Sequence, residues 1–272
     1  MCYFTIITPT WNQAEFIGDT IESVLKQRFR DFEYLIIDNC SDDGTEEIVR
    51  SYAEKDERIR YIREEDHGQA EAINKGLKVA KGKAVAWLNS DDLYFDEYVL
   101  ERVAAQFDRY PGVGVIAGDA WYCDKDKNLT TYNEADRGVG RKMIRRWYYI
   151  VQPAVFWRNH GELLDETYHY AFDWKFFITL FEKEKVMWSH EPYALYRMYD
   201  DNKTGQDNAK RKKEIWRLQE ELKDSRLNTL WCKYVYQVYE KAEEKNRPGA
   251  KKRIDMMSKL LFHISGRRIA CF

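Results

Sequence analysis

TIITPTWNQAEFIGDTIESVLKQRFRDFEYLIIDNCSDDGTEEIV, residues 5–49, is the stretch that decides the fold. Residues 3–10 form a short apolar run that predicts a buried strand. Residues 12–28 then place apolar side chains at helical spacing, and residues 33–38 form a second apolar run that ends in an aspartate. Capping side chains (Ser, Asp and Thr) follow it, ahead of a second helical pattern. The stretch therefore predicts two successive strand–helix units.

The same alternation continues as far as residue 118. Further strands are expected at 58–64, 83–89 and 112–118, and further helices at 68–82, closed by Gly82, and at 96–109. Repeated strand–helix units with continuously apolar strands are typical of an α/β protein whose parallel sheet is covered on both faces. We therefore expect a Rossmann-like, mainly parallel sheet flanked by helices.

Composition sets the broad class. The chain has 272 residues, 44% of them hydrophobic, which is enough for one large domain or two small ones. The five cysteines are widely spaced without a CxxC pair, which suits a reducing compartment and argues against a disulfide framework or a zinc site. The sequence has no signal-peptide pattern and no apolar run near the ~18 residues of a membrane span. A cytoplasmic protein is expected.

Charge is divided unevenly along the chain. Residues 206–272 hold 17 lysines and arginines against 9 acidic residues, whereas the remainder holds 27 against 37. Helical patterns cover 206–245, and the last helix, within KKRIDMMSKLLFHISGRRIACF, is basic and amphipathic. Its basic face would suit peripheral contact with a membrane surface, while packing onto the rest of the chain is the favoured role for its apolar face.

Acidic side chains follow several of the predicted strands. Ligands of parallel sheets bind at the carboxyl ends of the strands. The four ends to inspect are Thr8–Thr10, Asp38–Asn39, Asp66–Gly68 and Asn89–Asp92, and three of them are acidic. An anion site would favour glycine-rich loops and lysine, whereas an acidic crevice suits a divalent cation and sugar hydroxyls. A lone pair of adjacent aspartates, however, is more often a solvated turn.

Three ordered blocks carry a family resemblance. Residues 5–49 resemble the opening of family 2 glycosyltransferases, which adopt the GT-A fold. GQAEAINKGLKVAKGKAVAWLNSDD (68–92) is similar to the next block of that family, which ends in a DxD-type metal motif. QPAVFWRNHGELLDETYHYAFDWKFFITL (152–180) is similar to the acceptor-side block. The resemblance covers about residues 4–204. It implies a nucleotide-sugar-binding half (1–120), an acceptor-binding half (121–205) and a C-terminal helical extension (206–272).

The resemblance also implies roles for individual residues. Asp92 would ligate Mn²⁺ or Mg²⁺, Asp91 would lie near the ribose and diphosphate, and Asp173 would be the general base. Asp38 would accept a hydrogen bond from the base of the nucleotide. The remaining nucleotide-binding residues implied are Thr8, Pro9, Thr10 and Glu15 around the base and ribose, Gln69 in the base pocket, and Arg197 and Lys203 at the diphosphate.

The sequence departs from the family pattern at three other positions. Tyr199 stands where relatives often carry a histidine that joins the metal shell, which puts a third protein ligand in doubt. Ile73 stands where many relatives have an arginine in the base pocket, so Gln69 or Glu71 would have to substitute, and uracil cannot be assumed as the base. Asn89 replaces a further acidic residue.

Asp173 can be interpreted in two ways from its own surroundings. Its place at the start of a predicted helix favours the ionised form, and Phe172 and Trp174 would shield it and raise its basicity. A carboxylate of this kind can take the proton from an acceptor hydroxyl as that hydroxyl attacks an anomeric carbon. Alternatively, Asp173 is a helix cap with no chemical role.

The sequence therefore predicts an inverting, metal-dependent glycosyltransferase. It would move a sugar from a nucleoside-diphosphate sugar to a hydroxyl of a saccharide or lipid-linked saccharide, in bacterial surface polysaccharide synthesis, with no nucleic-acid partner. The alternative is a non-catalytic nucleotide-sugar-binding or scaffolding protein on the same fold. A sugar-nucleotide pyrophosphorylase would need a Gly-rich basic loop after the first strand, and a nicotinamide dehydrogenase would need GxGxxG. TPTWNQAE, residues 8–15, has neither.

Overall fold

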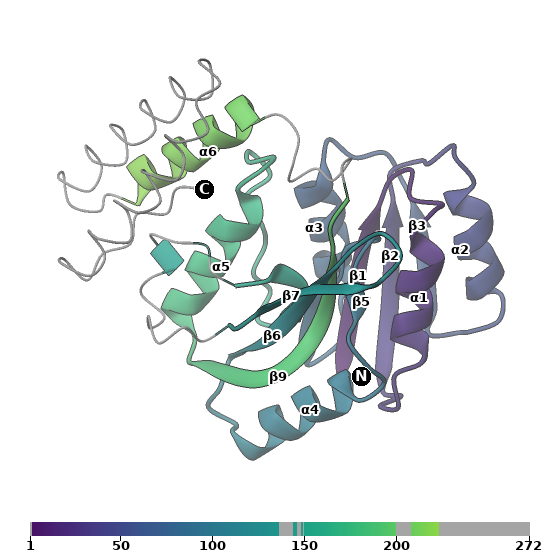
Figure 1. The fold of residues 1–272 in the computed structure, drawn as a ribbon, viewed down its shortest axis with the longest axis horizontal. Helices are drawn as coiled ribbons and strands as arrows, with labels where there is room; N and C mark the ends of the chain where they lie inside the picture. Colours follow the sequence, from purple (N-terminus) through teal and green to yellow (C-terminus); the bar gives the residue numbers. More distant parts are fainter. Residues whose placement is uncertain (1, 136–143, 146–147, 149, 200–207, 223–272) are drawn as a thin grey trace.

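The computed structural model describes residues 2–135, 144–145, 148, 150–199 and 208–222. Within these residues, one nine-stranded sheet runs through the molecule in the order β3-β2-β1-β4-β8-β6-β9-β5, and β7 pairs with β6 (Figure 1). The strands are β1 (Phe4–Thr10), β2 (Phe32–Asp38), β3 (Ile59–Arg63), β4 (Ala84–Trp87), β5 (Leu93–Tyr94), β6 (Val115–Cys123), β7 (Leu129–Asn133), β8 (Val155–Arg158) and β9 (Val186–Arg197). The helices are α1 (Ile17–Leu25), α2 (Thr45–Ala53), α3 (Gln69–Val79), α4 (Val99–Arg109), α5 (Phe172–Lys183) and α6 (Asn208–Glu221), with a short 3₁₀ turn, η2 (Gln152–Ala154).

The first four strands form a parallel block, and β6 and β9 form a second parallel pair. β3, β2, β1 and β4 are all parallel to their neighbours, as the alternating sequence pattern predicts. β4 then pairs with β8 in antiparallel fashion, and β8 pairs likewise with β6. The predicted strand at 112–118 therefore does not lie beside β4. A strand from the aromatic second half of the chain is inserted between them, and the sheet is mixed although mostly parallel.

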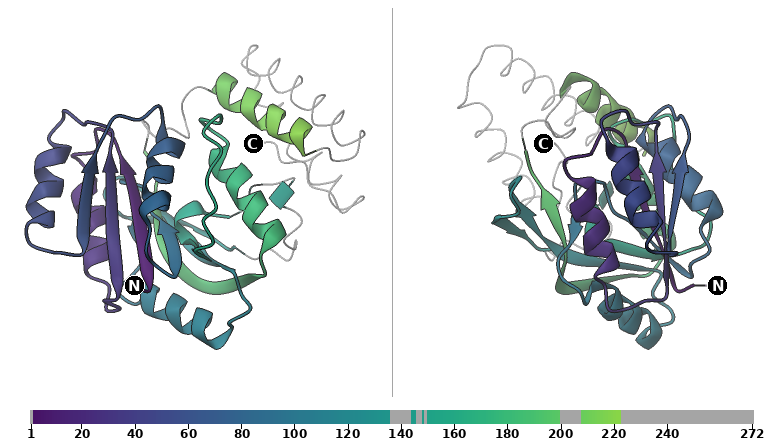
Figure 2. Two further views of the ribbon diagram at one scale, coloured as in Figure 1. Left: turned by 180° about the vertical axis from the view of Figure 1, so that it is seen from behind. Right: turned by 90° about the vertical axis from the view of Figure 1, so that its right-hand side faces the viewer.

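Helices cover both faces of this sheet (Figures 1 and 2). The apolar residues of α1, α2 and α4 pack on one face, together with Ile6 and Ile36 of the central strands. Those of α3 and α5 pack on the other face, against Ile7 and Leu35. Successive strand side chains point to opposite faces, so a strand that is apolar at every position must be covered on both sides.

The helices are shorter than their sequence patterns predict. α1 begins at Ile17, because the preceding residues form a loop whose backbone and side chains bond to the loop after β2. Asn12 N–H donates to Ser41 Oγ at 2.9 Å, and Gln13 N–H donates to Thr45 Oγ1 at 2.9 Å. This pairing brings the carboxyl ends of β1 and β2 into one surface.

Gly82 does not cap α3, so that prediction is wrong. The helix ends at Val79, and Gly82 is absent from the described residues with positive φ. A Cβ at Gly82 would lie 2.3 Å from the backbone nitrogen of Thr5 and 2.5 Å from the carbonyl carbon of Phe4. Glycine is required here because the chain entering β4 passes directly against the start of β1.

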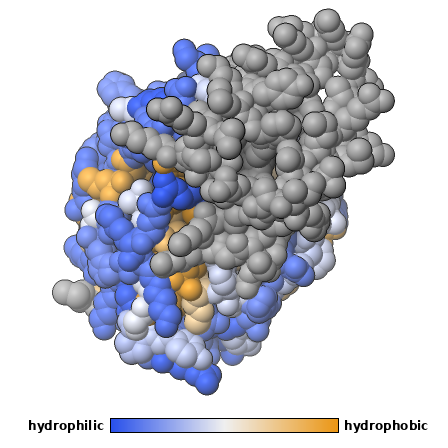
Figure 3. Space-filling model, turned by 90° about the vertical axis from the view of Figure 1, so that its left-hand side faces the viewer, coloured by the Kyte–Doolittle hydropathy of each residue, from blue (hydrophilic) through white to orange (hydrophobic). Residues whose placement is uncertain are grey.

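The face drawn in Figure 3 is mainly hydrophilic where its residues are described. On this face, the hydrophobic residues form small patches among polar ones. No helix among the described residues combines the length and the apolarity that a membrane crossing requires. The predicted basic last helix lies outside the described residues, whereas α6 falls within the predicted helical stretch 206–245.

Candidate functional site at the carboxyl edge of the sheet

The loop after β4 carries the adjacent Asp91 and Asp92, and a side chain of α1 fixes its backbone. The hydroxyl of Thr20 lies 2.9 Å from the carbonyl oxygen of Ser90 and 2.8 Å from that of Asp92, and donates to them. Thr20 is fully buried, as is the strand that delivers the loop. The backbone at 90–92 is therefore fixed to the helix that follows the first strand.

Asp92 and Asp91 face groups from the end of β9. Asp92 is 1% exposed, and its Oδ1 accepts the backbone N–H of Arg197 at 3.0 Å. Its Oδ2 accepts an N–H of the Asn89 side chain at 3.2 Å. Asp91 accepts the hydroxyl of Tyr199 at 3.0 Å. The carboxyl ends of β4 and β9 therefore meet at this pair of carboxylates.

Burial raises the pKa values of both carboxyl groups. Loss of solvent raises the pKa of Asp91, against smaller lowering effects from Tyr199 and Arg197. The pKa of Asp92 rises well above its usual value, first through burial and then through repulsion from Asp91. Two adjacent carboxyl groups, one buried and one partly buried, whose pKa values are raised are an arrangement that a bound cation would stabilise in the ionised form.

The residues at this pair fit a divalent metal ion in part. Asp91 and Asp92 offer hard carboxylate oxygens, which suit Mg²⁺ or Mn²⁺. Among the described residues, the only group of three potential ligand side chains close enough to share an ion is His160, Glu162 and Glu184. An ion at Asp91 and Asp92 would therefore complete its shell from water or from a ligand's diphosphate, as Mg²⁺ commonly does.

The His160 group lies at the opposite edge of the sheet. It follows β8, whose last residue, Arg158, pairs with the first residue of β4, Ala84. His160 Nδ1 is 3.0 Å from Glu184 Oε1, which makes an ion pair when the imidazole is protonated. Because the carboxyl end of β4 is far along the strand from this point, the group is separate from the crevice.

Amide side chains link the carboxylate loop to both halves of the molecule. Asn89 Oδ1 accepts from Gln69 Nε2 at 2.9 Å and from the indole N–H of Trp87 at 2.8 Å. Asn89 Nδ2 also donates to Gln152 Oε1 at 3.2 Å. The family resemblance implies a place for Gln69 in the base pocket, and the structure places it beside Asn89 of the loop after β4. The role of Gln69 toward a base stays a prediction.

The strand-end residues of β1 and β2 are all buried. Thr8 donates to the carbonyl oxygen of Leu88 at 2.7 Å. Asp38 is fully buried and accepts from Ser41 N–H, Ser41 Oγ and the hydroxyl of Tyr61. Thr10 differs, because its hydroxyl is buried without a hydrogen-bond partner among the described residues. A ligand could bond this hydroxyl only if the surrounding side chains moved to expose it. Pro9 lies between them in β1.

Asp173 was predicted just before the helix but is the second residue of α5, two positions after the N-cap residue Ala171. Its Oδ1 accepts the backbone N–H of Trp174 at 2.7 Å. Phe172, directly before it, stacks on Trp87 with ring centroids 5.6 Å apart. Burial, and then the charge of Asp173, raise the pKa of Tyr148 well above its usual value. Asp173 is thus packed next to the strand that delivers Asp91 and Asp92.

Two predicted nucleotide contacts are engaged elsewhere in this structure. Glu15 is largely exposed and forms an ion pair with Lys125 at 2.6 Å. Arg197 is 1% exposed, donates to Asp19 Oδ2 at 2.9 Å and lies over the ring of Phe16. Their roles toward a nucleotide stay predictions. Lys203 lies outside the described residues.

Several residues at the site were missed by sequence reasoning. None of Thr20, Tyr148 and Gln152 was predicted as a site residue, although Thr20 lies in the first family block and Gln152 opens the acceptor-side block. Tyr199 was noted only as a departure, and the structure shows its hydroxyl on Asp91. The order of strands β4, β8, β6 and β9 brings them together, and that order cannot be inferred from local pattern.

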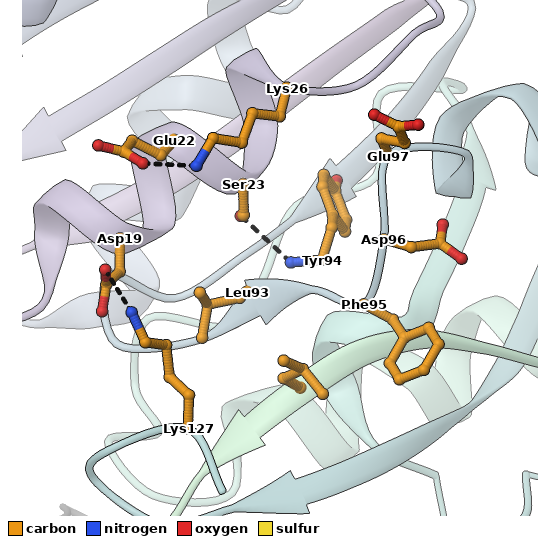
Figure 4. Close-up of a pocket in the computed structure, with 11 residues that line it drawn as sticks. Asp19, Glu22, Ser23, Lys26, Leu93, Tyr94, Phe95, Asp96, Glu97 and Lys127 are labelled. Carbon is orange, nitrogen blue, oxygen red and sulfur yellow. Dashed lines mark hydrogen bonds and ion pairs between the residues drawn. The ribbon is translucent and has the colours of Figure 1, made fainter. Parts of the chain in front are cut away.

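A polar hollow of about 360 Å³ lies beside the site, between α1 and the β5 strand (Figure 4). Glu22 and Lys26 of α1 form an ion pair at its rim, and Asp19 pairs with Lys127 at 2.9 Å. Asp19, which lines the hollow, also accepts a hydrogen bond from the side chain of Arg197. The backbone N–H of the same arginine donates to Asp92, so Arg197 connects the hollow to the carboxylate loop.

The fold is α/β, and the carboxyl edge of its sheet carries the buried Asp92 beside the partly buried Asp91. The chain belongs to glycosyl transferase family 2, whose family model matches residues 5–205. TuaG of Bacillus subtilis, provisionally named as a teichuronic acid biosynthesis glycosyltransferase, is 37% identical over 127 residues, covering 44% of this chain and 50% of that protein. The uncharacterized glycosyltransferase RP339 of Rickettsia prowazekii is 26% identical over 207 residues, covering 72% of this chain and 64% of its own. The matches thus span half to about two thirds of these relatives.

Solved structures show the same fold. TarS of S. aureus (residues 1–349, in complex with UDP-GlcNAc) superposes with a TM-score of 0.65 at 19% identity, covering 79% of this chain and 64% of that one. The mannosyltransferase PcManGT of Pyrobaculum calidifontis, in complex with GDP-Man and Mn²⁺, gives a TM-score of 0.60 at 16% identity, covering 83% of this chain and 65% of that one. The chain therefore has the GT-A glycosyltransferase fold.

Proposed function

We propose that the protein is an inverting, metal-dependent glycosyltransferase that moves a sugar from a nucleoside-diphosphate sugar to an acceptor hydroxyl. The observation that carries this is the adjacent pair of Asp91, partly buried, and Asp92, fully buried, at the carboxyl edge, with the pKa of each raised by loss of solvent. A pair of this kind is destabilising unless a cation or proton neutralises it. Mn²⁺ or Mg²⁺ bound there would stabilise the charge on a departing diphosphate.

The residues of the chain would divide the remaining work. Thr10, with its unpaired hydroxyl, and the neighbouring residues of β1 and β2 would hold the nucleoside. Asp173 would accept the proton of the acceptor hydroxyl while the acceptor oxygen bonds to the anomeric carbon, and the bond from that carbon to the diphosphate oxygen breaks. Attack from the face opposite the leaving group inverts the configuration. The stacked rings of Trp87 and Phe172, which come just before the Asp91–Asp92 loop and Asp173 in the chain, would help to exclude water from the reacting groups.

We further propose that the product is a surface polysaccharide. The support is the likeness to TuaG, provisionally named for teichuronic acid biosynthesis, and the fold shared with TarS. A saccharide or lipid-linked saccharide would then be the acceptor. A cytoplasmic protein that meets the membrane only at its surface would suit such an acceptor.

A melting-temperature screen tests the donor-binding part of this proposal. The protein would be heated with Mn²⁺ and each of a panel of UDP-, GDP-, dTDP- and CMP-sugars, because a ligand that binds the folded state raises the apparent stability. We expect one nucleotide class to raise the melting temperature, and only when Mn²⁺ is present. A panel in which no nucleotide sugar raises it, with or without Mn²⁺, would contradict the proposal.

A further inference from the structure

The carboxylate of Glu214, on α6, receives three successive backbone N–H groups from the loop before α5. His169 N–H lies 2.9 and 3.0 Å from the two carboxylate oxygens, and Tyr170 and Ala171 donate at 2.7 and 3.1 Å. Consecutive N–H groups that converge in this way form a concave site for an anion. Here the anion is a side chain 43 residues away from Ala171 in sequence.

This contact fixes the chain at the entrance of α5, because Glu214 accepts the N–H of the N-cap residue Ala171 and the two N–H groups before it. α5 begins at Phe172, and its N-cap residue is Ala171, whose methyl side chain cannot accept a hydrogen bond. Helices usually begin with Ser, Thr, Asp or Asn, whose side chains satisfy the first free N–H groups. A carboxylate near a helix N-terminus is also favoured by the helix dipole. Glu214 therefore stabilises the start of α5 from a different helix.

Further contacts from α6 and from the start of α3 fix the same loop. The guanidinium of Arg217, one turn along α6, donates to the carbonyl oxygen and hydroxyl of Thr167 at 3.1 and 2.9 Å. The imidazole of His169 lies against Gly68 at the start of α3, where an added Cβ would be 3.3 Å from Nδ1. The loop is thus fixed between α6 and the edge of the sheet, and Asp173 follows it two residues after Ala171.

We propose that Glu214 is a positioning residue for Asp173. It does not touch substrate; it fixes the first turn of α5 and so the direction of the Asp173 carboxylate toward the crevice. This inference rests on the proposed function, because it assumes that Asp173 is the general base. It also assigns to α6, which follows the family-matched segment, a part in building the active site.

Kinetics of four proteins test this role: the wild type, Glu214→Ala, Glu214→Gln and, as a matched control on the same helix, the exposed Glu220→Gln. The readout is nucleotide release from the nucleotide sugar that gives the largest melting-temperature shift. We expect Glu214→Ala to lower kcat about 10- to 100-fold while the donor KM stays within twofold. Glu214→Gln keeps one accepting oxygen and should lose less, and Glu220→Gln should match the wild type.

Amide hydrogen exchange provides a readout that does not depend on activity. In Glu214→Ala, the amides of residues 169–171 should exchange faster, whereas those of β1 and β4 should keep their protection. Should Glu214→Ala fail to fold, Glu214→Gln carries the same comparison. Unchanged exchange at 169–171, or a wild-type kcat in a folded Glu214→Ala, overturns the positioning role and leaves the proposed function standing. A wild type that releases nucleotide from no donor overturns the proposed function and the positioning role together.

Discussion

The ring of Phe172 stacks on the indole of Trp87, with centroids 5.6 Å apart and planes inclined by 24°. Trp87 is the last residue of β4, and its N–H bonds Asn89 in the loop that carries Asp91 and Asp92. Phe172 is the first residue of α5 and directly precedes Asp173. This one aromatic contact therefore couples the position of the proposed base to that of the proposed metal site, although the two lie about 80 residues apart in sequence.

Replacing Asp173 with asparagine should remove the proton acceptor while keeping the shape of the side chain. The new amide oxygen can still accept the Trp174 N–H, so we expect the melting temperature and the nucleotide affinity to change little. Transfer should fall by roughly 10²- to 10⁴-fold. Asp126→Asn, in the exposed turn before β7, is the control. If Asp173→Asn transfers sugar at the wild-type rate, the base assignment is wrong.

Replacing Asp91 with asparagine should stabilise the metal-free protein at neutral pH. Burial raises the pKa of Asp91, so the folded chain holds this proton more tightly than the unfolded chain. The free energy of unfolding therefore falls as pH rises from about 4, the usual aspartate pKa, through the raised value. Asparagine removes this loss and also the repulsion on Asp92.

The gain in Asp91→Asn should be about 1 kcal/mol at pH 7, or roughly 2–4 °C in melting temperature. Melting curves in EDTA from pH 4 to pH 8 measure it, and the gain should shrink toward pH 4, where the wild-type carboxyl is protonated. The Tyr199 hydroxyl can turn to accept from the new amide, so no buried group is left unpaired. A variant that is less stable than the wild type at pH 7 in EDTA would refute the electrostatic account.

Metal should bind at Asp91 and Asp92 and stabilise the wild type. Adding Mn²⁺ to EDTA-treated protein should raise the melting temperature at pH 7.5, and more weakly at pH 5.5, because a proton competes for the same carboxylates. Asp92→Asn, which removes the predicted ligand, should lose most of this shift. His160→Ala, which disables the ligand group at the opposite edge, should keep it. The reverse pattern would place the metal at His160 instead.

Gly82 should be among the positions most sensitive to a single methyl group. Alanine there would put a Cβ 2.3 Å from the Thr5 nitrogen, and backbone atoms of β1 cannot move aside as a flexible side chain can. We expect Gly82→Ala to lower the free energy of unfolding by about 1–3 kcal/mol or more. Gly112→Ala, where an added Cβ meets nothing within 4 Å, is the matched control and should be within ~0.5 kcal/mol of wild type. Urea unfolding of both variants makes the comparison, and equal stabilities would show that β1 can yield.

Local sequence pattern predicts the parallel half of this fold well. The apolar run 33–38 and the helical spacing of 68–79 both result from burial against the sheet. Burial of this kind can be read from the residues of each segment alone. The carboxyl-edge residues Asp38, Asp91 and Asp92 follow from the same logic, since a strand's end is visible in the sequence. The confirmed family membership came from the order of these blocks.

The pairing of strands that are distant in sequence cannot be predicted from local pattern. β8 is four residues long and inserts between β4 and β6 in the opposite direction, a choice that its own residues do not encode. The contacts of Tyr199 with Asp91 and of Glu214 with Ala171 arise from that arrangement. Gly82 shows the opposite error, because a glycine after a helix suggested a cap, whereas close backbone contact explains it.

Nucleotide release from a panel of nucleotide sugars, followed with Mn²⁺ and again with excess EDTA, tests the central claim most directly. The account predicts that the wild type turns over one nucleotide class with Mn²⁺, that EDTA abolishes release, and that Asp92→Asn, folded by its melting curve, is inactive in both conditions. Release from no donor, or release that is equal with and without EDTA, would contradict a metal-dependent transferase at the Asp91–Asp92 crevice.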